Sequence, residues 1–131
     1  MNKVQMDEYL VSIGGLENGF YSDRPPIKNA NFFDVDEGWY ELIKDLIDDL
    51  IKLGWNKQVC QVKEKFGGVR FYINEGSDEI FKRIGKAEND SYKICEKCGE
   101  QGQFRNDIGW YLTLCDEHYK EKKSNYEKRK I

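Results

Sequence analysis

The feature that most constrains this chain is a set of cysteine and histidine residues in its C-terminal third. Cys95 and Cys98 are separated by two residues, and after sixteen intervening residues Cys115 and His118 are again separated by two. Three thiolates and one imidazole form a complete tetrahedral donor set for zinc. The spacing therefore predicts one structural Zn²⁺ ion held by these four side chains.

The residues around the two pairs indicate how the chain reaches a single ion. Gly99 follows the first pair and suits the crowded turn of a metal-binding knuckle. Residues 103–105 and 110–114 have the composition of two short strands, and Asp116 and Glu117 suit the first turn of a helix that carries the last ligand. Knuckle, hairpin and helix in this order resemble a treble-clef zinc finger.

Disulfide bonds, or cysteines that merely pack in a core, are the alternatives to a metal site. The residues after Met1 are polar and do not form an apolar leader, so we expect a cytoplasmic chain, where disulfides are rare. No apolar run reaches membrane-spanning length. The fourth cysteine, Cys60, lies in an apolar-alternating stretch, and we expect it to be a small buried hydrophobic residue.

The remainder of the 131 residues predicts an α+β core. A short helix is expected over residues 4–13, extended backbone at Pro25-Pro26, and a strongly amphipathic helix over 38–53. Strands over 58–63 and 69–74 form a hairpin, and Ser77 caps a further helix. We expect an α+β core over 1–93, a zinc-finger module over 94–119 and a basic terminal helix over 120–131.

Charge is unevenly distributed along the chain. Residues 1–49 hold 4 Lys/Arg and 11 Asp/Glu, whereas residues 119–131 hold 6 basic and 2 acidic residues. Glu41, Asp45, Asp48 and Asp49 form an acidic face on the long helix, where Asp48 could pair with Lys52. This face is either an ordinary solvated surface or a site for a cationic partner.

Several aromatic residues lie within or close to the basic end of the chain, namely Phe104, Trp110, Tyr111, Tyr119 and Tyr126. Basic residues interleaved with aromatic ones can contact phosphates and stack on bases, so a nucleic-acid contact is one interpretation and simple solvation of a terminal helix is the other. The candidate partner-binding residues in this part of the chain are Arg105, Trp110, Tyr111, Lys120, Lys122 and Lys123.

The composition argues against most catalytic chemistry. His118 is the sole histidine, and the metal shell requires it. The HNH nuclease site that a treble clef can host, and Ser-His or Cys-His catalysis, need a free histidine, so we expect no enzyme of these classes. Carboxylate-only metal chemistry, for instance at Asp45 and Asp49, stays open.

Several strings also resemble a family of small uncharacterised proteins from bacteria and their phages. The resemblance covers roughly residues 36–118 and includes Gly38-Trp39-Tyr40, Leu53-Gly54-Trp55, the run from Gln61 to Tyr72, Ala87-Glu88, Ser91 and the finger itself. It implies a mobile-element setting in a bacterial host cell, where small proteins bind host machinery, including defence systems such as a CRISPR effector.

Two functions from different classes therefore remain. The first is a non-catalytic, zinc-stabilised protein that docks on a host protein or nucleoprotein complex and could inhibit it. The second is a nucleic-acid-binding module that uses the finger hairpin and the basic tail. The first is favoured because the net charge of the chain outside the basic tail is negative.

Overall fold

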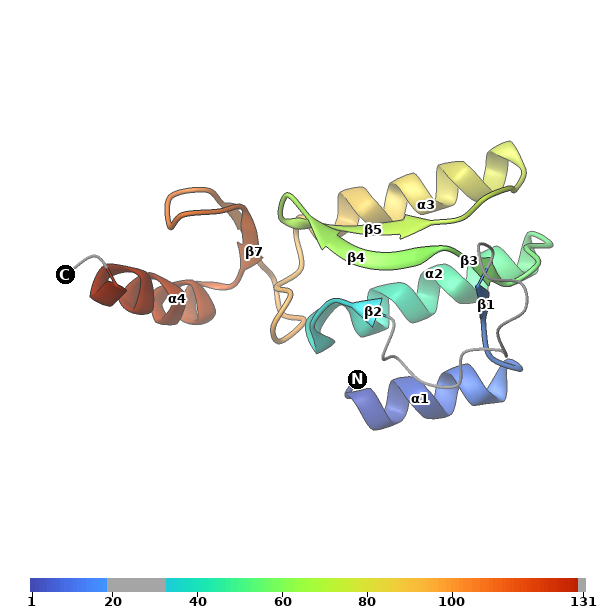
Figure 1. Cartoon of the computed structure of the whole chain (residues 1–131), viewed down its shortest axis with the longest axis horizontal. Helices are drawn as coiled ribbons and strands as arrows, with labels where there is room; N and C mark the ends of the chain where they lie inside the picture. Colours follow the sequence, from blue (N-terminus) through green and yellow to red (C-terminus); the bar gives the residue numbers. More distant parts are fainter. Residues whose placement is uncertain (19–32, 130–131) are drawn as a thin grey trace.

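The structure is a computed structural model that describes residues 1–18 and 33–129. Its elements form an elongated molecule, with a helix-and-sheet core at one end and a small hairpin followed by the terminal helix at the other (Figure 1). Helices and strands are both present and the strands form small sheets, so the predicted α+β class is confirmed.

Three helices form most of the core. Helix α1 spans Lys3–Ser12 and begins with a capping box, in which the Asn2 side chain and the Gln5 side chain each accept a hydrogen bond from the other residue's backbone N–H. A 3₁₀ turn, η2 (Glu37–Trp39), leads into α2 (Tyr40–Lys52). Helix α3 spans Asp78–Ser91 and is capped by the Ser77 hydroxyl, which accepts from the Ile80 N–H as the sequence predicted.

The main sheet contains three strands. Strands β4 (Gln61–Lys65) and β5 (Gly68–Tyr72) form the predicted antiparallel hairpin around Phe66 and Gly67. The short β2 (Phe33–Asp34) adds to β4 in parallel, and β1 (Glu17–Asn18) pairs in parallel with β3 (Gln58–Val59). These parallel pairs join segments far apart in sequence, which no local pattern predicts.

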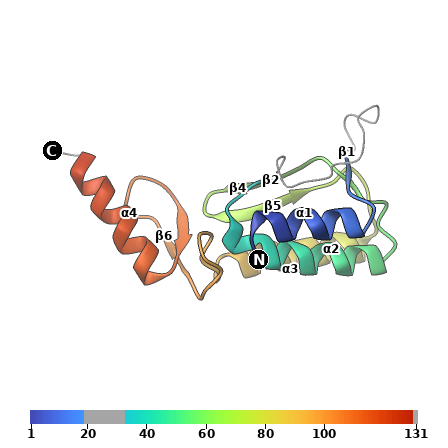
Figure 2. The ribbon, with the colours of Figure 1, turned by 90° about the horizontal axis from the view of Figure 1, so that it is seen from below.

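The apolar faces of the helices and the sheet meet in one core. Figure 2 shows α1, α2 and α3 side by side beneath the sheet, so the helices cover one of its faces. Val69 and Phe71 point into the core, whereas Arg70 and Tyr72 lie on the opposite face, as strand alternation requires. The fully buried side chains include Met6, Leu10, Trp39, Ile43, Leu46, Ile47 and Leu50.

The small C-terminal unit follows α3 directly. Strands β6 (Gln103–Arg105) and β7 (Leu112–Leu114) form an antiparallel hairpin, and α4 spans Asp116–Arg129. The order knuckle, hairpin, helix is therefore confirmed. No helix within the described residues has both the length and the apolar composition needed to cross a membrane.

Three local expectations need comment. Cys60 is half-buried rather than a core residue, because the break between β3 and β4 adds a residue and lets both Val59 and Val62 point inward. Asp48 pairs with Lys44 at 3.0 Å and not with Lys52, because Tyr9 and Lys44 approach it from the α1 side. The extended backbone predicted at Pro25-Pro26 lies outside the described residues.

Candidate metal centre

The first half of the metal centre is a tight knuckle between α3 and β6. The Gly99 N–H donates to the Cys95 carbonyl at 2.9 Å, which turns the chain so that Cys95 and Cys98 face the same point. Gly99 has φ +82°, a left-handed conformation that favours glycine over residues with a Cβ. A second backbone hydrogen bond closes the knuckle, because the Cys95 N–H donates to the Glu100 carbonyl at 2.8 Å.

The second half of the centre joins the hairpin to α4. Cys115 lies between β7 and α4, and His118 follows one turn later, where its N–H approaches the Cys115 sulfur at 3.5 Å. The Tyr119 N–H donates to the Cys115 carbonyl at 2.9 Å and continues the helix. Both ligands are thus fixed by the start of a regular helix, and not by a free loop.

The four donor atoms meet at one point. They all lie within 4.8 Å of one another, with 3.8 Å between the sulfurs of Cys98 and Cys115 and 3.6 Å from the Cys95 sulfur to His118 Nδ1. Tetrahedral bonds of about 2.3 Å to sulfur and about 2.0 Å to nitrogen would separate sulfurs by about 3.8 Å and sulfur from nitrogen by about 3.5 Å. The separation of Cys115 Sγ from His118 Nδ1 is shorter, at 3.1 Å. The four side chains predicted as ligands therefore form a candidate metal-binding site.

The local electrostatics fit a cation at this point. Burial would raise the pKa of the Cys95 thiol, but backbone N–H groups from Cys115, Cys98 and Lys97 outweigh burial and lower it. Desolvation and the neighbouring thiols raise the pKa of Cys98 to about 11. Three sulfurs this close cannot all ionise without a compensating positive charge, which a bound metal ion would supply.

The metal-binding unit is joined to the core through the turn that precedes α2. The Gly38 N–H donates to the Glu96 carbonyl at 2.8 Å, and the Trp39 indole N–H donates to the Ile94 carbonyl at 2.9 Å. A Cβ on Gly38 would lie 2.2 Å from the Cys95 carbonyl oxygen, so only glycine allows this approach. Sequence patterns did not identify Gly38 as part of the site. The only local signal is that this glycine directly precedes Trp39.

Glu96, between two ligands, completes this junction. Its side chain is buried, and burial together with the Asp36 carboxylate raises the pKa of Glu96 to about 7. Lys97 forms a 2.8 Å ion pair with Asp36 and so links the knuckle to the segment ahead of η2. Sequence spacing identified the two flanking cysteines but gave no sign that the glutamate between them is buried.

A second attachment lies on the opposite side of the finger. The buried Thr113 hydroxyl donates to the Gly67 carbonyl at 2.6 Å, and the Glu96 N–H donates to the Thr113 carbonyl at 3.0 Å. Strand β7 is therefore bonded both to the knuckle and to the β4–β5 turn. Together, the two attachments hold the metal centre in a fixed position relative to the core.

The predicted acidic face on α2 is divided by the fold. Asp48 accepts from the Tyr9 hydroxyl at 2.6 Å as well as from Lys44, and Asp49 pairs with Arg83 of α3 at 2.7 Å. These two partly exposed carboxylates therefore link α2 to α1 and to α3. Glu41 and Asp45 are exposed and line a groove of about 670 Å³ that also includes the knuckle residue Cys98.

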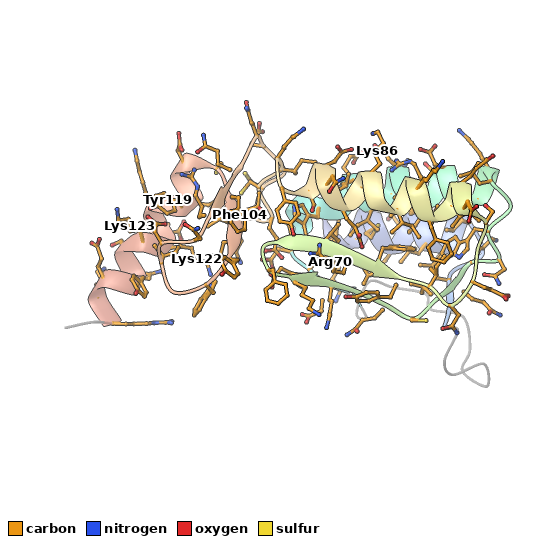
Figure 3. All side chains as sticks on the ribbon, turned by 90° about the horizontal axis from the view of Figure 1, so that it is seen from above. Arg70, Lys86, Phe104, Tyr119, Lys122 and Lys123 are labelled. Carbon is orange, nitrogen blue, oxygen red and sulfur yellow. The ribbon has the colours of Figure 1, made fainter. Side chains whose placement is uncertain are left out.

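The basic and aromatic candidates are also divided. The Arg105 guanidinium donates to the Leu114 carbonyl and to Asp116 and lies over the Tyr119 ring at 4.2 Å, so it braces the finger. Trp110 and Tyr111 are exposed at the tip of the hairpin. On α4, Lys120 and Lys123 are exposed and Lys122 is half-buried; Figure 3 shows Lys122 and Lys123 beside Tyr119.

Comparison with known proteins does not identify a family for this chain. No family model matches the chain, and neither curated proteins nor solved structures gave a match.

Proposed function

We propose that this protein is a non-catalytic binding protein whose C-terminal third is held rigid by one zinc ion. The observation that carries the proposal is the convergence of Cys95, Cys98, Cys115 and His118 on one point. Thiolate and imidazole donors in this ratio favour zinc over calcium or magnesium, which prefer oxygen ligands. When bound, the ion would act as a structural cross-link between knuckle, hairpin and helix.

The absence of a catalytic role is part of this proposal. Four protein ligands fill a tetrahedral shell and leave no position for substrate or water. The only histidine of the chain contributes Nδ1 to the cluster. Asp49, one of the carboxylates that a magnesium-dependent reaction would need, is bound to Arg83.

The proposed partner is a protein complex of a bacterial host. The resemblance of residues 36–118 to small proteins of bacteria and phages suggests such a host, and inhibition of a defence complex is one consequence that docking could have. The rigid attachment of the finger to the core supports docking, because a surface that does not reorganise loses less entropy on binding. Nucleic-acid binding through the finger and α4 is the competing function.

Metal analysis of the purified full-length chain tests the zinc site. We expect one zinc per chain, lost in Cys98→Ser and Cys115→Ser. Cys60→Ser is the matched control, because Cys60 is a half-buried cysteine outside the cluster. A protein without stoichiometric zinc, or equal loss in the Cys60 variant, would overturn the assignment.

Binding measurements separate the two functions. The zinc-loaded chain is titrated with single- and double-stranded DNA and RNA at low and at physiological salt. Tight binding that collapses with salt and with removal of residues 119–131 would establish the nucleic-acid function instead. We expect weak nucleic-acid binding, and recovery of one host complex that depends on bound zinc.

A further inference from the structure

A cluster of exposed aromatic residues lies where the finger meets the β4–β5 turn. Phe66 is 59% exposed, Phe104 44%, Trp110 54% and Tyr111 47%. We call these four residues the aromatic face. Single exposed aromatic residues are ordinary, but a contiguous group on a small protein marks an interaction site.

The rings of the aromatic face contact one another across the two units. Tyr111 stacks on Phe104 with centroids 5.6 Å apart, and it meets Phe66 edge-on at 6.1 Å. Phe66 belongs to the core hairpin, whereas Phe104 and Tyr111 belong to the finger. The face therefore exists only when the metal-binding unit is docked on the core.

The backbone beneath the aromatic face is tightly fixed. Gly67 has φ +87°, and a Cβ there would lie 2.9 Å from the Phe104 ring. The Gly67 carbonyl accepts from the Thr113 hydroxyl and its N–H donates to the Glu64 carboxylate at 2.8 Å. Rings held in this way are arranged before a partner arrives, which reduces the entropy lost on binding.

Trp110 separates two grooves that continue the aromatic face. A groove of about 520 Å³ lies between Phe66, Tyr111 and Trp110. On the other side of Trp110, a groove of about 440 Å³ is lined by Ile108, Leu112, Tyr126 and the α4 cations Lys122 and Arg129. An extended segment that crosses Trp110 would occupy both grooves.

The charges along this path favour an acidic partner. Lys65 lies beside the aromatic face, with its ammonium group 5.5 Å from the Phe66 ring centroid, and Lys122 and Arg129 line the second groove. Among the described residues, neither Lys122 nor Arg129 forms an ion pair.

Three carboxylates near the aromatic face are engaged within the chain. Glu64 accepts from the Gly67 N–H, Asp107 accepts from the Tyr119 hydroxyl, and Asp116 pairs with Arg105. Among the described residues, the surface therefore offers aromatic rings beside cations that form no ion pair.

A protein segment fits this pattern better than a nucleic acid. A nucleic-acid strand needs cations along its whole path to neutralise successive phosphates, whereas here Lys122 and Arg129 line only the groove beside α4, and Glu64 lines the other groove.

We propose that the aromatic face binds an extended acidic protein segment that inserts an apolar side chain beside Trp110 and places carboxylates near Lys65 and Lys122. This inference rests on the proposed binding function and names its surface and the chemistry of its partner.

Selection from a displayed library of random linear peptides, with the zinc-loaded full-length chain as bait, tests the proposal. We expect enrichment of peptides with an aromatic residue or leucine flanked by Asp or Glu. Their binding is then followed by fluorescence of Trp110, because Trp39 and Trp55 are buried at 0% and 5% exposure and respond little.

Matched variants identify the surface. Trp110→Ala should weaken the selected peptides by about tenfold or more, as for a central interface tryptophan. Phe81→Ala is its control, because Phe81 is 46% exposed on α3 and outside the face. Lys122→Glu should weaken binding several-fold at low salt and less at high salt, whereas Lys82→Glu on α3 should not.

Each other outcome would overturn the proposal. No enrichment, enrichment of basic peptides, or equal loss in the Phe81 variant would exclude this surface or this partner. Saturable quenching of Trp110 by oligo(dT) or oligo(U), with no peptide selected, would assign the face to nucleic acid. Concentration-dependent dimerisation lost in Trp110→Ala would assign it to a second copy. Zinc content of the same preparations separates any of these results from failure of the metal site.

Discussion

Gly38 offers a direct test of how strongly the metal-binding unit is joined to the core. In Gly38→Ala, the new Cβ would lie 2.2 Å from the Cys95 carbonyl oxygen and 2.4 Å from that of Glu96, and both are backbone atoms. Real Cβ contacts are not shorter than 3.0 Å, so the knuckle must retreat by at least 0.8 Å. That shift would break the 2.8 Å hydrogen bond from the Gly38 N–H to Glu96 and strain the one from Trp39 to Ile94.

The magnitude follows from these two hydrogen bonds. A buried donor left without an acceptor costs about 1–3 kcal/mol. The loss of one bond and the weakening of another should therefore lower the free energy of unfolding by about 2–5 kcal/mol. Because the knuckle itself moves, zinc affinity should fall as well.

Urea unfolding of the zinc-loaded protein, followed by Trp39 fluorescence, measures the first effect, and competition with a chromophoric chelator measures the second. Gly85→Ala is the matched control, because a Cβ there meets nothing within 4 Å in the middle of α3. Alanine in place of that helical glycine should stabilise by about 0.5–1 kcal/mol. If Gly38→Ala unfolded at the wild-type urea concentration and kept its zinc, the junction would not couple the two units.

Three further outcomes are expected. The Tyr9 and Lys44 hydrogen bonds outweigh desolvation and lower the pKa of Asp48 below 3.8, so its contribution to stability is present above that pH and is lost as the pH falls through the lowered pKa. Asp48→Asn should therefore lower the free energy of unfolding by about 1 kcal/mol at neutral pH. In acid, its urea midpoint should equal that of the wild type. A difference in midpoint that does not change with pH would contradict this reasoning. Thr113→Val, which leaves the buried Gly67 carbonyl without its donor, should destabilise by about 1–3 kcal/mol in urea unfolding, and an unchanged midpoint would contradict the contact. Zinc should be released on acidification, because the thiolates become protonated. The backbone amides of residues 94–129 should then exchange their hydrogens faster, before those of α2 do. Simultaneous exchange in both parts would show that the core and the finger unfold together.

Local patterns predicted most of the elements correctly. The helical spacing of apolar residues identified α2 within two residues of its ends, and Ser77 marked the start of α3. Strand alternation gave the β4–β5 hairpin and the side of the sheet on which Val69 and Phe71 lie. Each of these depends on neighbours within a few residues, which a sequence shows directly.

Other features could not be read from local patterns. The parallel pairing of β2 with β4 joins segments almost thirty residues apart. The sequence allowed Asp48 to pair with Lys52, but Asp48 pairs with Lys44, also on α2, whose ammonium group lies over the ring of Tyr9 of α1. Tyr9 itself donates to Asp48. The fate of such a side chain depends on which element packs against it, and that is a property of the whole fold.

The sequence by itself indicated the candidate metal centre, because two pairs of ligands, each at a two-residue spacing, on a knuckle and at a helix start supply a complete donor set for one ion. Only the tertiary structure decided where that centre sits. The close approach of Gly38 to the knuckle and the hydrogen bond from Thr113 to Gly67 bring Phe66 of the core beside Tyr111 of the finger. Phe66 and Tyr111 are 45 positions apart in the sequence, and they meet only because the finger packs against the core. Sequence patterns relate residues a few positions apart, so they cannot predict such a contact.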